Sequence, residues 1–386
     1  MIIHCHHSHN PVSGEMKRII NINNDVVASI DSDIIEVELY SIRYLKYVRN
    51  SGRFLLSPHI KKKYYIPNIP SLSILNDLYR ILIMVFLFMR HKPEYYIEEW
   101  SLPRGINIIR KLFNKCKIGL DIHGAAPEEY IYINNKRSKS LEESERCSVL
   151  SADFIICQSN AMKEHLIKKY TLGTPIGVYR CAVDTNVFVY NDDVRRNIRQ
   201  NLGYDDDDVV FVYSGGMHPW QKVEDAILIF SYFHSVNPKS KFLIITKEQD
   251  AFLSIITKIN KNDLLSDITT VSLNYNDVPS YLCAADVSFL LRDNHIMNAV
   301  ASPTKLAEYL SCGLPVISYE VSKNWVDKEG LKFILSIDNN ITNKTNLITE
   351  FIAHSSRVQI SKYAKSKLSL DIDKLNINSF IDKYLS

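Results

Sequence analysis

Short apolar runs alternate with longer amphipathic stretches along the whole chain, which predicts parallel sheets with helices on both faces. Six candidate strands lie in the first half, at residues 1–5, 34–40, 95–98, 118–122, 154–158 and 177–181. Five follow in the second half, at residues 209–213, 242–246, 269–273, 287–291 and 315–319. Helical stretches lie between them, for example at residues 72–89, 138–150, 161–170 and 224–236. The pattern is that of an α/β protein.

A polar segment at residues 191–208 divides this pattern into two halves. It contains four consecutive aspartates, 205–208, which are most simply a solvated turn before a strand, and we assign them no metal. We therefore expect two Rossmann-like domains, over residues 1–188 and 189–370. The last stretch, residues 371–386, is expected to be a helix that packs back on the first domain.

The clearest chemical signal is the segment SPTKLAEYLSCGLPVIS at residues 302–318. Ser302 is a suitable N-cap, because its hydroxyl can accept from amides that open a helix. Pro303 fits the first helical position, where a missing N–H costs nothing. Gly313 and Pro315 end the helix before the next strand. The segment therefore predicts a βαβ unit whose helix N-terminus is open to an anion.

Three side chains of this predicted helix could bind a nucleotide. Thr304 and Lys305 lie in the first turn, where the lysine ammonium can reach an anion held by free amides. Glu308 lies roughly 4–5 Å further along the axis, at the usual helical rise. That offset suits a carboxylate that binds ribose hydroxyls while the helix end holds a diphosphate. The alternative is a surface Lys and Glu on an ordinary helix.

Composition narrows the class of protein. The chain has 386 residues, is 46% hydrophobic and carries a net charge of +3, which is too small to indicate a nucleic-acid binder. Its seven cysteines show no CxxC pair, which favours reduced thiols in a cytoplasmic protein. No signal peptide is evident, and the longest apolar run, residues 81–89, is about half of a bilayer span. We expect no transmembrane helix.

Several segments, in this order, resemble the two-Rossmann-domain (GT-B) glycosyltransferases, specifically the retaining enzymes of family 4. Residues 302–317 are similar to that family's donor signature, E-x7-E followed by a Gly-Pro-Val strand. Residues 213–230, YSGGMHPWQKVEDAILIF, resemble its first C-terminal strand and phosphate loop. Residues 153–170 and 179–188 resemble the end of its N-terminal domain, and residues 119–124, GLDIHG, a strand that ends in a His near the reacting sugar.

The chain departs from the family pattern at the donor signature. Val300 stands eight residues before Glu308, where the family has its first Glu, which is associated with the donor sugar. Asp293, on the same loop, could substitute, or the chain could belong to a subgroup with a P-x-K variant.

The phosphate loop departs too. Gly216 replaces a common Arg, and Gln221-Lys222 stands where Lys-Gly is usual. Lys222 is then a shifted phosphate ligand, with Lys305 or Arg292 as the second cation.

The resemblance implies two domains that face each other across a cleft, the first binding the acceptor and the second the nucleotide sugar. It implies retaining transfer of a hexose or N-acetylhexosamine, with a uridine nucleotide favoured, to a saccharide or lipid-linked saccharide, without a metal or other cofactor. The catalytic candidates are His123, Lys305 and Glu308. The donor-binding candidates are Gly14, Gly215, Gly216, Lys222, Arg292, Ser302, Pro303, Thr304, Lys305 and Glu308.

Some of these assignments have plain structural alternatives. His123 could cap a tight His-Gly turn, and Gly14 could belong to an ordinary turn rather than to a flexible loop between donor and acceptor. The cluster His4, His6, His7 and His9 lacks the second ligand group that a zinc site needs, so we expect it to line the acceptor side.

A basic, aromatic segment follows in the first domain. Its cations are Arg43, Lys46, Arg49, Arg53, Lys61, Lys62 and Lys63, with no acidic residue among them. Such a segment suits the acceptor side or an anionic membrane surface, and the alternative is a solvated helix face and loop. We expect a cytoplasmic protein that can associate with the inner face of the plasma membrane and that binds no nucleic acid.

Three functions remain open. The favoured one is a glycosyltransferase in the synthesis of a bacterial surface polysaccharide, such as lipopolysaccharide or capsule. A nucleotide-sugar 2-epimerase shares the fold but needs carboxylates around the sugar, and no clear set is present. A non-catalytic partner subunit would explain the missing Glu and Arg.

Overall fold

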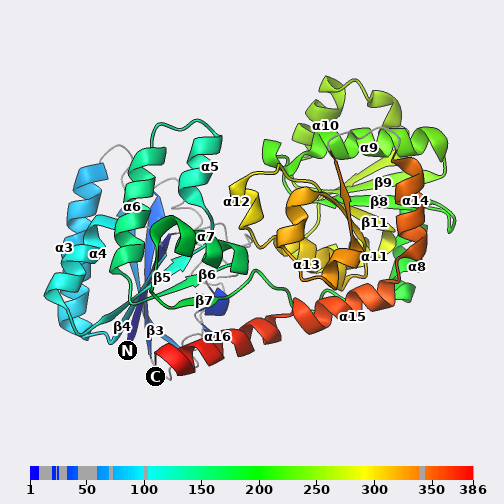
Figure 1. Cartoon of the computed structure of the whole chain (residues 1–386). Helices are drawn as coiled ribbons and strands as arrows, with labels where there is room; N and C mark the ends of the chain where they lie inside the picture. The colour runs from blue at the N-terminus through cyan, green and yellow to red at the C-terminus, as the bar shows by residue number, and fades with distance from the viewer. Residues whose placement is uncertain are drawn as a thin grey trace. The chain divides into compact units, whose positions relative to one another are not determined.

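The computed structural model describes residues 1–7, 20–22, 24–25, 33–41, 59–68, 73–99, 103–338 and 344–385. The chain divides into two compact units, each with its own parallel sheet (Figure 1). Unit 1 comprises Met1–Cys181, Val300–Ser302 and Asp373–Ser386. Unit 2 comprises Ala182–Ala299 and Pro303–Ile372.

The sheet of unit 1 has seven strands in the described part of the chain, in the order β3-β2-β1-β4-β5-β6-β7. Every neighbouring pair is parallel. The strands are β1 (Ile2–His7), β2 (Ile34–Ser41), β3 (Ile60–Asn68), β4 (Tyr95–Glu99), β5 (Lys117–Ile122), β6 (Phe154–Cys157) and β7 (Ile176–Val178).

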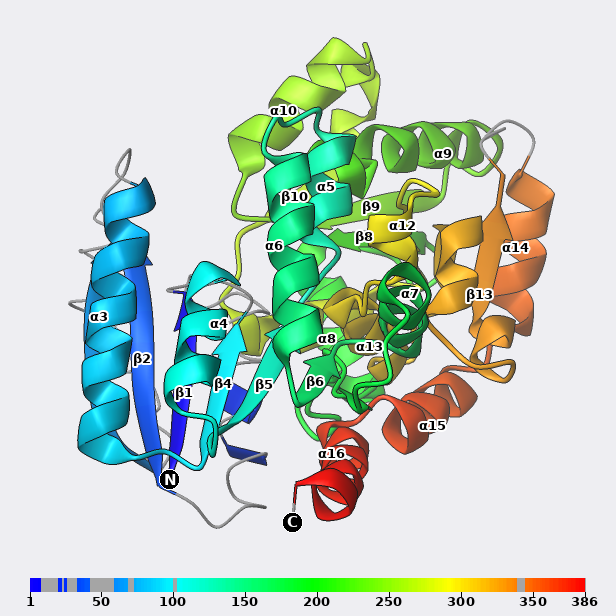
Figure 2. The ribbon, with the colours of Figure 1, turned by 60° about the vertical axis from the view of Figure 1, so that its left-hand side comes forward.

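Helices cover both faces of this sheet. One apolar face packs on α3 (Ser73–His91), α4 (Pro103–Leu112), α6 (Ser138–Ser151) and α7 (Asn160–Tyr170). In Figure 2, α3 and α4 lie in front of the strands β2, β1 and β4. The short helix α5 (Ala126–Tyr132) follows β5. The opposite face carries α16 (Leu370–Tyr384), whose Ile377 and Ile381 pack with Phe154 and Ile156.

The last helix therefore belongs to the first unit, although the residues before it belong to the second. The close fit is visible at Gly177, where an added Cβ would lie 2.8 Å from the ring of Phe380. Arg180 binds Asp373 at 2.7 Å and fixes the start of this helix.

The sheet of unit 2 has the order β10-β9-β8-β11-β12-β13, and its neighbouring strands are again parallel. Its strands are β8 (Val209–Ser214), β9 (Ser240–Ile245), β10 (Ile268–Val271), β11 (Val287–Leu290), β12 (Val316–Tyr319) and β13 (Ile334–Ile337). One face packs on α9 (Val223–Val236), α10 (Gln249–Lys258) and α14 (Thr345–His354). The other packs on α11 (Val278–Ala284), α13 (Thr304–Ser311) and α15 (Arg357–Lys367).

The predicted α/β fold with two parallel sheets is confirmed. Two strands were missed, β3 and β13. The sequence of β3, IKKKYYIPN, has three lysines after its first residue, so the alternative of a solvated helix face or loop is wrong for Lys61–Lys63. The register of β3 beside β2 explains why a strand can carry these lysines, because Glu36 of β2 lies opposite Lys63.

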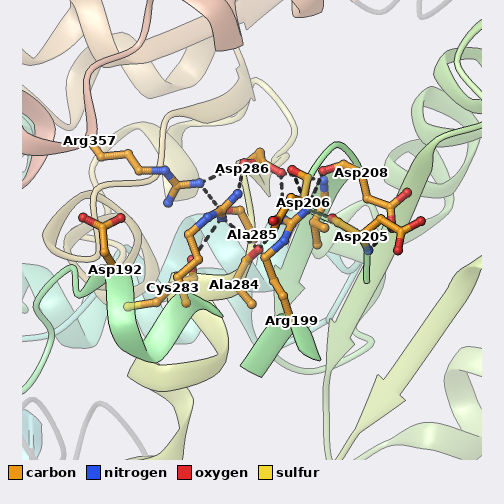
Figure 3. A network of polar contacts seen from close by, with 12 residues as sticks. Asp192, Arg199, Asp205, Asp206, Asp208, Cys283, Ala284, Ala285, Asp286 and Arg357 are labelled. Carbon is orange, nitrogen blue, oxygen red and sulfur yellow. Dashed lines mark hydrogen bonds and ion pairs between the residues drawn. The ribbon is translucent and has the colours of Figure 1, made fainter. Parts of the chain in front are cut away.

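The aspartate run at 205–208 is more than a solvated turn. It follows α8 (Asp192–Leu202), whose Arg199 donates to the carbonyl oxygens of Asp205 at 2.5 Å and Asp208 at 2.7 Å. The same guanidinium donates to Ala284 O at the end of α11 (Figure 3). Asp286, which precedes β11, binds Arg199 at 3.3 Å. One buried arginine thus ties the turn before β8 to the helix and strand beside it.

Candidate active site

The candidate donor site lies at the carboxyl ends of β8 and β11 in unit 2. β8 ends at Ser214 and is followed by two glycines, Gly215 and Gly216. Gly215 has φ +146°, a conformation that residues with a Cβ rarely adopt, and an added Cβ would displace the Lys305 ammonium, which would lie 1.8 Å away. Its amide donates to Ile245 O at 2.9 Å, which gives Gly215 a steric role rather than that of an anion donor.

Lys305 extends from the first turn of α13 towards this loop. Its ammonium lies 3.5 Å from Tyr213 Oη and 3.4 Å from Gln221 Oε1, and sits 4.9 Å from the centre of the Tyr213 ring. Burial and the nearby Arg292 lower the pKa of Lys305 to about 7, although Glu308 and Glu248 favour the charged form. This cation is therefore poorly compensated within the protein.

Arg292 supplies a second cation at the end of β11. Burial lowers the pKa of its guanidinium, against the opposing influence of the Tyr213 and Tyr309 hydroxyls. Its Nε is buried, with no hydrogen-bond partner in the described part of the chain. Arg292 and Lys305 thus form a pair of partly buried like charges, which an anion between them would stabilise.

Two tyrosines that sequence reasoning missed hold the loop beneath this pair. Tyr213 donates to Gly216 O at 2.5 Å, and the hydroxyl of Tyr309 accepts from Ser214 N at 2.8 Å. The available signal was position, because Tyr213 is the second-last residue of the strand before the glycines and Tyr309 follows Lys305 by one helical turn. Glu248 was also missed, and it accepts from Met217 N at 2.7 Å.

The start of α13 differs from the prediction by one residue. The N-cap is Pro303, which has an extended conformation (φ −69°, ψ 113°), and the helix begins at Thr304. Ser302 is not the cap, because its hydroxyl instead accepts from Cys181 N at 3.1 Å. The amides of Thr304 and Lys305 precede the first backbone bond, from Leu306 N to Pro303 O. An open first turn beside Lys305 therefore remains part of the site.

Glu308 lies one turn after Lys305 and is buried, with 8% of its surface exposed. Burial and then the Glu308 carboxylate raise the pKa of Tyr275, which places these two side chains near each other. The carboxylate also favours the charged form of Lys305.

Lys222 and Asp293, two residues with separate predicted roles, contact each other. Lys222 has a left-handed backbone (φ 51°) before α9, and its Nζ lies 2.9 Å from Asp293 Oδ1. Asp293 already offsets the positive charge of Lys222, whereas the positive charges of Lys305 and Arg292 are offset less by nearby carboxylates. The phosphate role of Lys222 and the substituting role of Asp293 both stay predictions.

Val300, at the position of the absent glutamate, is buried in the core of unit 1. Its carbonyl oxygen accepts from Ser159 Oγ at 2.6 Å and from Gln158 Nε2 at 3.3 Å. A carboxylate at this position would have to enter an apolar core.

His123 follows β5 in unit 1, and both of its ring nitrogens face carboxylates. Nε2 lies 2.5 Å from Asp121 Oδ2, and Nδ1 lies 3.2 Å from Glu99 Oε1. Burial opposes the charged form, but these two carboxylates outweigh it and raise the pKa of His123 to about 9. Glu99 also accepts from His7 N at 2.6 Å. The ring is therefore an imidazolium at neutral pH.

A second ionic cluster lies further along the same sheet. His6 Nε2 contacts Glu36 Oε1 at 2.7 Å, and Lys63 lies 3.3 Å from Glu36 and 2.7 Å from Glu38. Burial opposes ionisation of Glu36, but His6 and Lys63 lower its pKa to about 2. Lys63 is thus paired within the sheet, and Lys61 pairs with Asp33. Lys61 and Lys62 are exposed, with the Lys62 ammonium 4.9 Å from the centre of the Tyr64 ring, whereas Lys63 is partly buried.

Several candidates lie outside the described residues: Gly14, Arg43, Lys46, Arg49 and Arg53. Among the residues that the structure describes, no three His, Cys, Asp or Glu side chains are grouped so as to hold a metal ion. Within the same part of the chain, no helix has both the length and the apolar character to cross a bilayer.

Comparison with known protein families finds a similarity that is confined to unit 2. Residues 194–367 match the family model described as Glycosyl transferases group 1. No curated protein matches the chain significantly in sequence.

Solved structures share the fold over nearly the whole chain. Sucrose-phosphate synthase from Thermosynechococcus elongatus is 13% identical, with a TM-score of 0.74 over 99% of this chain and 98% of that one. Anabaena Alr3699/HepE, solved in complex with UDP, is 14% identical, with a TM-score of 0.74 over 99% of both chains. WaaG, a glycosyltransferase involved in lipopolysaccharide biosynthesis, is 12% identical, with a TM-score of 0.65 over 98% of this chain and 99% of that one. Residues 194–367 of unit 2 are thus similar to the glycosyl transferases of group 1, and the whole chain shares the two-sheet GT-B fold of these solved structures.

Proposed function

We propose that the chain transfers a hexose or N-acetylhexosamine from a UDP-sugar, with retention of configuration, to a hydroxyl of a saccharide or lipid-linked saccharide. The main support for the donor site is the partly buried pair of cations, Lys305 and Arg292, beside the open first turn of α13. Burial and mutual repulsion destabilise the charged forms of these two side chains. Their two positive charges are complementary to the two negative charges of a diphosphate. Binding the donor would relieve that repulsion.

The same pair would serve the chemistry as well as the binding. When the glycosidic bond breaks, negative charge develops on the diphosphate leaving group. Lys305 and Arg292 are held in place by the protein before reaction, so they would stabilise this charge without reorganisation. The Lys305 ammonium would donate a hydrogen bond to the oxygen of the leaving group.

Glu308 is proposed to bind the ribose hydroxyls. Its position one turn below Lys305, on the same helix, supports this role. The uridine base is supported by the fold neighbour Alr3699/HepE, which was solved with UDP and with UDP-glucose.

Unit 1 is proposed to bind the acceptor, and His123 to act through its charge. Because Asp121 and Glu99 engage both ring nitrogens, the imidazolium would support the developing negative charge electrostatically rather than as a proton acceptor. The named role of WaaG in lipopolysaccharide biosynthesis supports a surface polysaccharide as the product class. We propose that the reaction is cytoplasmic and independent of a bound metal.

The test measures donor affinity by calorimetry with UDP-glucose and sugar release by a hydrolysis assay. Lys305→Met and Glu308→Ala should each weaken binding at least about tenfold, since each removes an interaction of a charged group. The controls Lys323→Met and Glu320→Ala remove an exposed ion pair and should bind as the parent does. Lys305→Met should not unfold the protein, because it removes a buried charge whose lowered pKa opposes folding.

Unchanged affinity in both site variants would refute the donor site. Tight binding with no sugar release would favour a non-catalytic partner subunit. Free epimerised nucleotide sugar formed without an acceptor would favour an epimerase.

A further inference from the structure

The outer side of α3 carries an exposed apolar stripe. Leu78, Leu82, Phe86 and Met89 recur every three or four residues and therefore share one side of the helix. They are 55%, 69%, 54% and 59% exposed. The opposite side of α3 packs on the sheet through Met84, Leu87 and Phe88. A surface helix normally turns polar residues outwards, and packing among the described residues of unit 1 does not explain this stripe.

Helix α4, the neighbour of α3, extends the apolar surface. Its Ile108 and Leu112 are 40% and 59% exposed. A pocket of about 560 Å³ joins the two helices at their C-terminal ends, where Met89 and Leu112 lie in its wall with Phe88 and Phe113. We call the six exposed residues the α3–α4 surface: Leu78, Leu82, Phe86, Met89, Ile108 and Leu112.

Basic residues surround the pocket end of the α3–α4 surface. Residues 78–93 and 103–117 contain no Asp or Glu, and the first of these segments is flanked by Asp77 and by Glu94, of which Glu94 lies at the pocket. Five exposed cations lie in these segments: Arg90, Lys92, Lys111, Lys115 and Lys117. Arg110 is not among them, because Asp153 binds its guanidinium at 2.7 and 2.8 Å.

We propose that the α3–α4 surface docks on a lipid bilayer with anionic headgroups. An apolar helix face beside a cluster of lysines and arginines is the composition of segments that lie in the membrane interface. The apolar residues would enter the acyl boundary, and the basic residues would contact the headgroups.

A second copy of the chain fits this surface less well. A two-fold dimer through the α3–α4 surface would place the same patch of both copies together. The exposed cations of one copy would then face those of the other, which is unfavourable across an interface.

This surface differs from the basic segment first considered for membrane contact. Lys61 and Lys63 of that segment are paired with Asp33, Glu36 and Glu38, so their charges are already compensated. The cations of α3, α4 and the loops after them stand beside exposed apolar side chains instead. The proposal is independent of the donor site, because none of its residues belongs to unit 2.

The test is co-sedimentation of the full chain with vesicles of phosphatidylcholine, with and without phosphatidylglycerol. The parent should bind the anionic vesicles at low salt and lose this binding as salt rises. Leu82→Gln with Phe86→Gln should weaken binding at least about tenfold, because two apolar side chains are lost from the interface. Lys111→Gln with Lys115→Gln should weaken it by about fivefold for each charge removed.

The matched control is Val236→Gln with Val358→Gln, which removes two apolar residues of unit 2 that are 68% and 71% exposed. It should bind anionic vesicles as the parent does. Thermal unfolding with UDP-glucose checks that every variant keeps its fold.

Three outcomes would overturn the proposal. The parent could fail to bind anionic vesicles at low salt, or the control could lose as much binding as Leu82→Gln with Phe86→Gln. The third is a dimer in sedimentation equilibrium that this double variant dissociates while vesicle binding is unchanged.

Discussion

Lys305 is the most important residue of the proposed donor site, because the protein does not fully compensate its charge. Its ammonium is buried next to Arg292, and its pKa falls to about 7. Near neutral pH, a substantial fraction of the free protein therefore carries an uncharged Lys305. An anion bound beside it would restore the charge, so donor binding and proton uptake are linked.

This linkage predicts a pH dependence of donor affinity. Below pH 7 Lys305 is already charged, so the affinity for UDP-glucose should be nearly constant. Above pH 7 each binding event takes up a proton, because the bound diphosphate raises the pKa of Lys305. The affinity should then fall by up to about tenfold per pH unit. Calorimetry between pH 6 and 8.5, in buffers of different ionisation enthalpy, measures both the affinity and the proton uptake.

Lys305→Arg provides the control for this experiment, because a guanidinium stays charged across the whole range. Its affinity should change little with pH. A parent protein whose affinity is equally flat, with no proton uptake, would show that Lys305 does not contact the donor.

The individual site residues differ in how far the sequence could reveal them. Lys305, Glu308 and the two glycines stand in recognisable motifs, and the structure brings Lys305 and Gly215 into direct contact. The pairing of Lys222 with Asp293 could not be predicted, because it joins residues 71 positions apart through tertiary structure. The shift of the N-cap to Pro303 follows from the distant Cys181 amide, which occupies the Ser302 hydroxyl.

At the scale of elements, buried strands with a continuous apolar run were predictable, and the charged edge strand was not. β3 alternates only weakly and begins with lysines whose partners, Asp33, Glu36 and Glu38, lie on or beside another strand. The turn at 205–208 shows the same limit. Its aspartates are polar as predicted, but what orders the turn is Arg199 of the preceding helix, through backbone oxygens.

Arg199 should therefore be one of the more important residues for the stability of unit 2. Its side chain is 3% exposed and donates to carbonyl oxygens of Asp205, Asp208 and Ala284. In Arg199→Ala, Asp208 O loses its side-chain donor, whereas Asp286 and Ala284 O still accept from Arg195, so the free energy of unfolding should fall by about 2–3 kcal/mol. Urea denaturation of the full chain measures this loss.

Arg196, three residues before Arg199 on the same helix, gives a matched control. It is exposed and pairs with Asp193 at 2.5 Å, so Arg196→Ala should change the free energy of unfolding by less than about 1 kcal/mol. Equal effects of the two substitutions would contradict the role given to Arg199.

At the scale of the whole molecule, the alternation of strands and helices was enough to predict two parallel sheets. The family resemblance predicted the fold that the solved structures share over nearly the whole chain. The α3–α4 surface was not predictable, because the apolar pattern of α3 is also that of a buried helix. Only the structure separates its inner residues, such as Met84 and Leu87, from the exposed Leu82 and Phe86. The sequence of unit 1 also contains no motif that identifies which acceptor the protein binds.

The most direct measurement is a crystal structure of the chain bound to UDP-glucose. The donor site described above requires the diphosphate beside the first turn of α13, with an oxygen within hydrogen-bond distance of both Lys305 Nζ and the Arg292 guanidinium. Glu308 should lie against the ribose hydroxyls. A diphosphate bound elsewhere, with Lys305 and Arg292 in contact only with protein atoms or water, would contradict the account.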